Sequence, residues 1–345
     1  MFSKSITIPV GIFLCIGICA FVVPPKHDTD WTDQSSLTQV LRDLGDKMPV
    51  HFLETYSPED VKRGEDIIKK GFTNSPEGKV SSRVSKYFLC THCHNTVIED
   101  PDIKISDPER RLAFAESQKI PFLPATTFYG VVNRKTFYND DYAKKYGSLV
   151  LPARDTLVNA IQLCATECSQ GRKMTDWEIK SVLAYFYSIE YKLKDLNLTP
   201  EDWEILNTAA ESHASEDNTK AVNTLKSKFL QASPATFTNP YDKSGRTFGE
   251  GGNVTNGERI YKHTCQWCHK VTGGVSDFKM DDEKITFRFL KKKLKKNSKF
   301  SVYYMIRKGT YAVPGHRPYM PNFSLERLSK TQMEDLVAFI LSKAK

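Results

Sequence analysis

The chain has 345 residues, a formal net charge of +8 and 26% charged residues. Its apolar content of 40% excludes a disordered chain, and its length suits two domains of ordinary size. The positive charge favours acidic partners or surfaces. No basic run interleaved with aromatic residues indicates a nucleic-acid-binding module, so nucleic acid is not expected as a partner.

The N-terminal residues carry an apolar run, ITIPVGIFLCIGICAFVV (6–23), that follows a positive residue, Lys4. This pattern predicts an export signal within residues 1–25, and therefore a periplasmic or otherwise exported protein. An uncleaved anchor that attaches the protein to the membrane is the alternative, because the run is just long enough to span a bilayer. The third possibility is that Cys15 or Cys19 is the attachment site of a lipid.

An amphipathic helix is expected in VKRGEDIIKKGF (61–72), and its Gly-Glu-x-Ile-x-Lys pattern returns in VTNGERIYKHTC (254–265). The apolar positions expected on the buried faces are Ile67, Ile68, Ile260 and Tyr261. The repeat indicates one arrangement of helices that the chain uses twice. Few segments have the alternating pattern of a strand, so the fold class predicted is all-α.

A Cys-x-x-Cys-His motif follows each copy of this helix, in FLCTHCHNTV (88–97) and HTCQWCHKVT (263–272). The residues of the two motifs are Cys90, Cys93, His94, Cys265, Cys268 and His269. Two thiols at this spacing can bond to both vinyl groups of one haem, and the adjacent imidazole then reaches the iron. The motif is the attachment signature of c-type haem, so two covalently bound haems are expected, with His94 and His269 as iron ligands.

Two other uses of paired cysteines are weaker. A zinc site needs two Cys-x-x-Cys pairs that converge on one metal, and a thioredoxin-like motif needs a strand-to-helix junction. Neither explains the histidine in both copies or the export signal.

The remaining cysteines lie in LVNAIQLCATECSQGR (157–172). Read as one helix that stops at Gly171, this segment places Cys164 and Cys168 on one face. Three readings stay open: a structural disulfide, which needs some local unwinding; two small buried hydrophobic side chains; or a thiolate ligand or reactive group at the first haem.

A methionine precedes an amphipathic helix at the end of each half. KMTDWEIKSVLAYFYS (173–188) contains Met174 and a capping box, and YMPNFSLERLSKTQMEDLVAFILS (319–342) contains Met320 and a second one. The capping pairs are Thr175 with Glu178 and Ser329 with Gln332. Each half therefore contains a helix, a haem motif, a methionine and a terminal helix.

Both halves resemble class I c-type cytochrome domains, so the whole is similar to a di-haem cytochrome c. The resemblance implies two helical domains, each wrapped around one haem, with the motif histidine as proximal ligand and a methionine as sixth ligand. Met320, in a Tyr-Met-Pro context, matches that pattern well; Met305 and His316 are weaker alternatives. Met174 lacks this context, and the spare thiols loosely resemble those of thiosulfate-oxidising cytochromes.

Four segments follow from these patterns: residues 1–25 as signal or anchor, 26–195 as the first cytochrome domain with insertions, 196–249 as a helical and linker segment, and 250–345 as the second cytochrome domain. The function predicted is electron transfer between periplasmic or membrane redox partners. Acidic partners are expected to dock near the basic run 288–299. The alternative is an oxidoreductase that acts on a sulfur compound or peroxide at the first haem.

Overall fold

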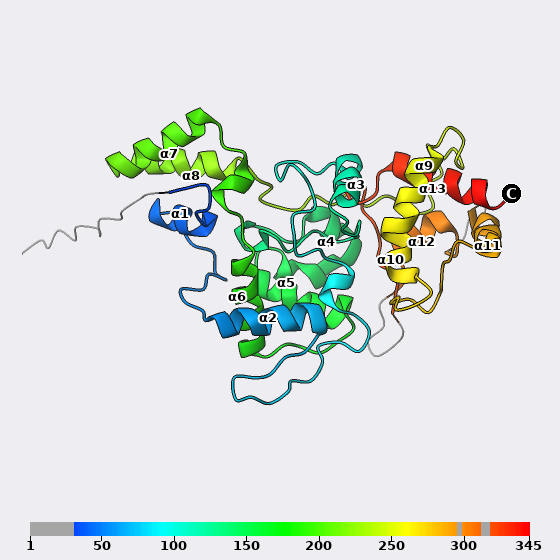
Figure 1. Ribbon diagram of the computed structural model, residues 1–345, viewed down its shortest axis with the longest axis horizontal. Coiled ribbons are helices and arrows are strands. Elements are labelled where there is room, and N and C mark those ends of the chain that lie inside the picture. The colour runs from blue at the N-terminus through cyan, green and yellow to red at the C-terminus, as the bar shows by residue number, and fades with distance from the viewer. Residues whose placement is uncertain (1–30, 295–298, 312–317) are drawn as a thin grey trace, which may run out of the picture. The chain divides into compact units, whose positions relative to one another are not determined.

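The computed structural model describes residues 31–294, 299–311 and 318–345 (Figure 1). The described residues from Trp31 onward belong to one compact unit. They form helices and contain isolated β-bridges but no β-strand, which confirms the all-α prediction. The N-terminal signal or anchor, His316 and part of the basic run lie outside the described residues.

The first helix crossing joins α2 (Pro58–Lys70) to α6 (Asp176–Ser188). The capping box predicted for α6 is present, and Ile67 and Ile68 of α2 are buried as expected. Gly64 allows the close approach, because a Cβ atom there would lie 1.9 Å from the carbonyl oxygen of Ser181.

The second crossing has the same design and joins α9 (Val254–Ile260) to α13 (Lys330–Lys343). Ile260 and Tyr261 are fully buried, and the capping box of α13 is also present. A Cβ atom on Gly257 would lie 2.0 Å from the carbonyl oxygen of Asp335. The Gly-Glu repeat of the sequence is thus a repeat of helix crossings.

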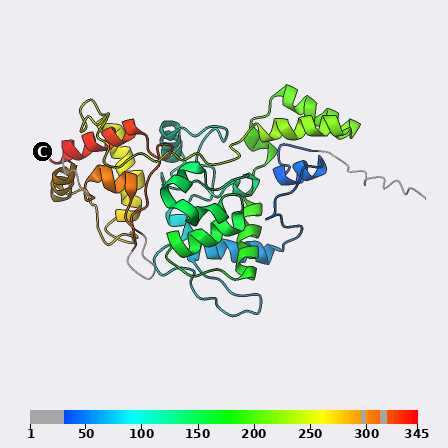
Figure 2. The ribbon, with the colours of Figure 1, turned by 180° about the vertical axis from the view of Figure 1, so that it is seen from behind.

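The other α-helices lie beside these two crossings, except that α1, α7 and α8 form a group of their own at one end (Figures 1 and 2). They are α1 (Leu37–Asp43), α3 (Pro108–Ser117), α4 (Asp140–Tyr146), α5 (Leu157–Leu163), α7 (Pro200–Ser212), α8 (Ser215–Lys226), α10 (Gln266–His269), α11 (Lys284–Leu294) and α12 (Val302–Lys308). Helices α7 and α8 pack together and share an apolar core with α1. This core is separate from the cores around the two crossings.

The segment expected as one helix over 157–172 differs from that expectation. α5 ends at Leu163 and continues as a π-helical turn, Cys164–Cys168. The amide of Ser169 donates to the carbonyl of Cys164 at 2.7 Å, five residues back, so the helix widens by one residue per turn. A second π-helical turn, Tyr261–Cys265, leads into the second motif. Turns of this kind occur often at functional sites.

Candidate haem-binding sites

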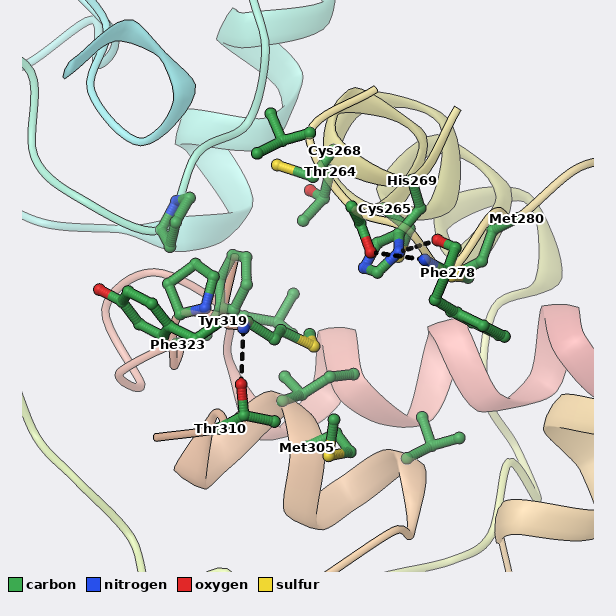
Figure 3. Close-up of a pocket in the computed structure, with 18 of the residues that line it drawn as sticks. Thr264, Cys265, Cys268, His269, Phe278, Met280, Met305, Thr310, Tyr319 and Phe323 are labelled. Carbon is green, nitrogen blue, oxygen red and sulfur yellow. Dashed lines mark hydrogen bonds between the residues drawn. The ribbon is translucent and has the colours of Figure 1, made fainter. Parts of the chain in front are cut away.

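The second motif lies on continuous helical structure formed by α9, the π-helical turn and α10. Its Cys265, Cys268 and His269 all face a cavity of about 410 Å³ (Figure 3). The lining is mainly apolar and includes Ile260, Leu336 and Ile340 from the α9–α13 crossing. A cavity of this size, walled by apolar groups and two thiols, fits a covalently attached macrocycle.

The imidazole of His269 is held in one orientation by the main chain. Its Nδ1 lies 2.7 Å from the carbonyl oxygen of Phe278, which leaves Nε2 available to a metal (Figure 3). Burial lowers the pKa of His269, so the neutral ring that binds metals is favoured.

Met320 lies in the wall of the same cavity. Its amide donates to Thr310 Oγ1 at 2.8 Å, and its carbonyl accepts from the amide of Thr310 at 2.9 Å. Gly309, at φ +71°, lets the two segments approach, because a Cβ atom there would lie 2.5 Å from the Met320 carbonyl oxygen. Met305 and Met280 also line the cavity, so the structure brings three thioethers to it.

The first motif has different local structure. Cys90–His92 form one 3₁₀ turn, and the Leu89 amide donates to Nδ1 of His92. His94 Nδ1 lies 2.6 Å from the carbonyl oxygen of Thr126, the same arrangement as at His269. Nε2 of His94 is therefore also left for a metal.

The His94 ring is more enclosed than that of His269. It stacks on Phe128 with ring centroids 4.2 Å apart and 13° between planes, and Phe128 in turn contacts Phe186 of α6. Burial lowers the pKa of His94 to about 4. At neutral pH the ring is neutral and can donate its free nitrogen lone pair to a metal.

Met174 lies in the apolar core of the α2–α6 crossing, and Cys90 packs against the same core. The Gln162 side chain fixes its backbone on both sides: the Met174 amide donates to Oε1 at 2.9 Å, and its carbonyl accepts from Nε2 at 2.8 Å. The side chain is buried. The predicted ligand is therefore in the core that holds the first attachment cysteine.

The thiols of Cys164 and Cys168 lie close together on the π-helical turn. Cys168 hydrogen-bonds Cys164 and the Tyr319 side chain. The interaction with Cys164 and burial raise the pKa of Cys168 well above its usual value, although the bond to Tyr319 acts in the opposite direction. Both cysteines are free thiols in this structure. Tyr319, the partner of Cys168, is the residue before Met320, so this face of the turn points toward the second site.

One short segment connects the two motifs. The Phe122 amide donates to the carbonyl of His263 at 3.0 Å, and the Ala125 amide donates to the carbonyl of Cys93 at 3.2 Å. In addition, Thr264 Oγ1 donates to the Phe122 carbonyl. Cys93 itself lines the cavity of the second site. The two attachment motifs are therefore neighbours in space, although about half the chain separates them.

Several of these residues have only a weak signal in the sequence. Phe128 is one of many aromatic residues in 127–147, Tyr319 stands out only as the neighbour of Met320, and Met280 is an isolated methionine. Their roles depend on loops whose course the local pattern does not specify. The acceptors of the two histidines, Thr126 and Phe278, act through backbone carbonyls, which every residue has.

Among the described residues, no group of three or more His, Cys, Asp or Glu side chains is arranged to hold a metal ion directly. The paired cysteines do not converge on one centre of that kind, as the zinc reading requires. In the same residues, no helix has the length and apolar character needed to cross a membrane.

Comparison with known proteins finds a family match in the C-terminal part of the chain. Residues 252–340 match the family model described as cytochrome c oxidase, cbb3-type, subunit III. No curated protein and no solved structure matches the chain significantly. The matched stretch, about a quarter of the chain, contains the second motif, most of the residues that line its cavity, and Met320. The protein therefore contains a c-type cytochrome domain, which binds haem c covalently, transfers electrons and has redox proteins as partners.

Proposed function

We propose that the protein is an exported di-haem cytochrome c that transfers electrons between redox partners. The observation that carries the proposal is the similarity of the two sites. Each has a Cys-x-x-Cys-His motif beside a glycine-mediated helix crossing, and in each the histidine Nδ1 is held by a backbone carbonyl. The family match covers the second site, and this similarity extends the assignment to the first.

In this proposal Cys90 and Cys93 attach one haem, and Cys265 and Cys268 attach the other. His94 and His269 would ligate the two irons, and Met320 and Met174 would each supply a further ligand. A haem iron coordinated by His and Met supplies reversible one-electron transfer at a raised potential. The chain excludes water, fixes each imidazole through its carbonyl acceptor, and places the two motifs side by side through the Phe122–Ala125 segment.

The surface around the second cavity suits a protein partner. Phe289 and Phe300 line the cavity and are also exposed, and α11 ends in Lys291, Lys292 and Lys293. An apolar patch beside positive charge fits a partner whose docking face is acidic. The N-terminal pattern supports an exported location and possible attachment to the membrane. The family match does not favour the alternative, oxidation of a sulfur compound or reduction of peroxide at the first haem.

Haem content tests the proposal directly. The full chain is produced in a host that matures c-type cytochromes, and haem per chain is measured by mass spectrometry and by the pyridine haemochrome spectrum. We expect two haems in the native chain and one in each of two matched variants, Cys90→Ala/Cys93→Ala and Cys265→Ala/Cys268→Ala. A native chain with one haem, unaffected by loss of the first pair of cysteines, would refute the di-haem function.

A further inference from the structure

A buried ion pair joins the first haem motif to the region around the second. Glu99 lies five residues after His94, and Arg327 lies between the Met320 segment and α13. Their closest atoms, Oε1 of Glu99 and Nη2 of Arg327, are 2.6 Å apart, and the two residues are only 5% and 6% exposed. A pair this deeply buried is costly unless every charge is well compensated, so its presence calls for a physical reason.

Hydrogen bonds connect Glu99 to the loop that orients His94. Glu99 Oε1 accepts from the Thr127 amide at 2.9 Å, and Oε2 accepts from the Asn95 side chain at 3.0 Å. Thr127 in turn donates through Oγ1 to the carbonyls of Asn95 and Val97. The residue before Thr127 is Thr126, whose carbonyl holds His94 Nδ1. Glu99 therefore fixes both the start of the loop, next to His94, and the position of the acceptor.

The carboxylate keeps its charge in this environment. Burial by itself raises the pKa of Glu99, but Arg327 and Arg111 outweigh burial and lower the pKa to about 2. Arg111, which is 2% exposed, lies 4.0 Å from Glu99 and donates to the carbonyl of Arg327 at 2.6 Å. Glu99, Arg327 and Arg134 all lie close enough to the His94 imidazole to interact with it electrostatically.

We propose that Glu99 and Arg327 are positioning residues for the first haem: they fix the His94 loop and set the reduction potential of that haem with opposite signs. This inference rests on the proposed di-haem function. A ferric haem has one more positive charge than a ferrous haem, so a nearby carboxylate stabilises the ferric state and a nearby guanidinium the ferrous state. Because Arg327 comes from the region of the second haem, that region contributes to the potential of the first.

Charge-neutralising variants test this directly. In Glu99→Gln the amide oxygen can still accept from the Thr127 amide, so this contact to the loop is kept, while the negative charge and the bond from Asn95 are lost. We expect the potential of the first haem to rise in Glu99→Gln and to fall in Arg327→Gln. It should return close to the native value in the double variant, and the conservative Arg327→Lys should change it least. Spectroelectrochemical titration measures both potentials, and electron paramagnetic resonance reports the ligand field at each iron.

The controls separate tuning from general damage. Asp46→Asn removes one partner of another ion pair between distant parts of the chain, Lys226–Asp46, and should leave both potentials unchanged. Shifts of the same sign in Glu99→Gln and Arg327→Gln, or equal shifts of both haems, would overturn the inference while two haems per chain keep the proposed function intact. A native chain with a single haem would refute both proposals. If Arg327→Gln does not fold, a raised potential in Glu99→Gln with a nearly unchanged one in Arg327→Lys supports the inference, and a lowered potential in Glu99→Gln overturns it.

Discussion

The two haem motifs are alike in sequence and differ in their surroundings. At the second site the motif follows Gly257 within one helical stretch and borders an open apolar cavity. At the first site an insertion separates Gly64 from Cys90, and His94 is enclosed by Phe128. In the di-haem proposal, the same attachment chemistry is placed once in an enclosed setting and once in a setting with exposed residues at its edge. We expect the second site to exchange electrons with partners and the first to be controlled by its protein environment.

The largest expected effect comes from removing the sixth ligand of the iron at the second site. Met320→Ala should remove the Met-to-iron charge-transfer band of the second haem and lower its potential by on the order of 0.2 V, since axial ligands set haem potentials over roughly 0.8 V. Near-infrared magnetic circular dichroism of the ferric protein, combined with a redox titration, measures both changes. The matched control is Met305→Ala, which alters the cavity wall and should keep the band.

The sixth ligand of the first haem is tested in the same way. Met174→Ala should remove a His/Met signature from the first haem and leave the second unchanged. Cys164→Ser and Cys168→Ser should leave both signatures in place, because in the electron-carrier proposal these thiols do not bind iron. A His/thiolate signature that disappears in Cys164→Ser or Cys168→Ser would contradict Met174 as ligand and revive chemistry on sulfur compounds at this site.

The next largest effect is a loss of stability at the two helix crossings, where the two halves of the chain are most alike. Gly64→Ala and Gly257→Ala should each reduce the free energy of unfolding by about 2–4 kcal/mol, because the added Cβ meets backbone atoms that cannot move easily. Denaturant unfolding followed by circular dichroism measures the loss. Glu258→Ala, which removes only a partly exposed ion pair with Lys262 beside Gly257, should change stability by no more than about 0.5 kcal/mol. If both glycine variants were as stable as native protein, the crossings would be looser than described.

The helix crossings could be predicted from the sequence because the features that determine them are local. Period, capping residues and the repeated Gly-Glu pattern are local, so the buried faces of α2 and α9 and both capping boxes were predictable. The contacts between the motifs were not, since they come from loops and from pairs such as Glu99–Arg327 that are far apart in the chain. The π-helical turn at Cys164 was missed because its hydrogen bonds depend on the packing around Gly171, where a Cβ atom would meet the Val84 carbonyl.

Acid should affect the first site through Glu99. The carboxylate pKa is about 2 in the folded protein and near 4.5 as an ordinary value, so its contribution to stability is present above pH 4.5 and disappears as pH falls toward 2. The shift corresponds to on the order of 3 kcal/mol. Glu99→Gln should therefore lose stability at neutral pH and show a flatter decline between pH 4.5 and 2, measured by unfolding at a series of pH values. An unchanged slope would show that Glu99 is not ionised in the buried pair.

The smallest effect expected is at the surface of the second site. Reversing two exposed lysines of α11, in Lys291→Glu/Lys292→Glu, should slow reduction of ferricyanide by the ferrous protein several-fold at low ionic strength, because the anionic reagent loses electrostatic attraction. The difference should vanish as salt screens the charges. Lys220→Glu/Lys243→Glu makes the same change in net charge on other exposed residues and separates a local effect from a global one. Equal slowing in both double variants would mean that only net charge matters; slowing confined to the α11 variant would make this helix the face by which electrons leave the second haem.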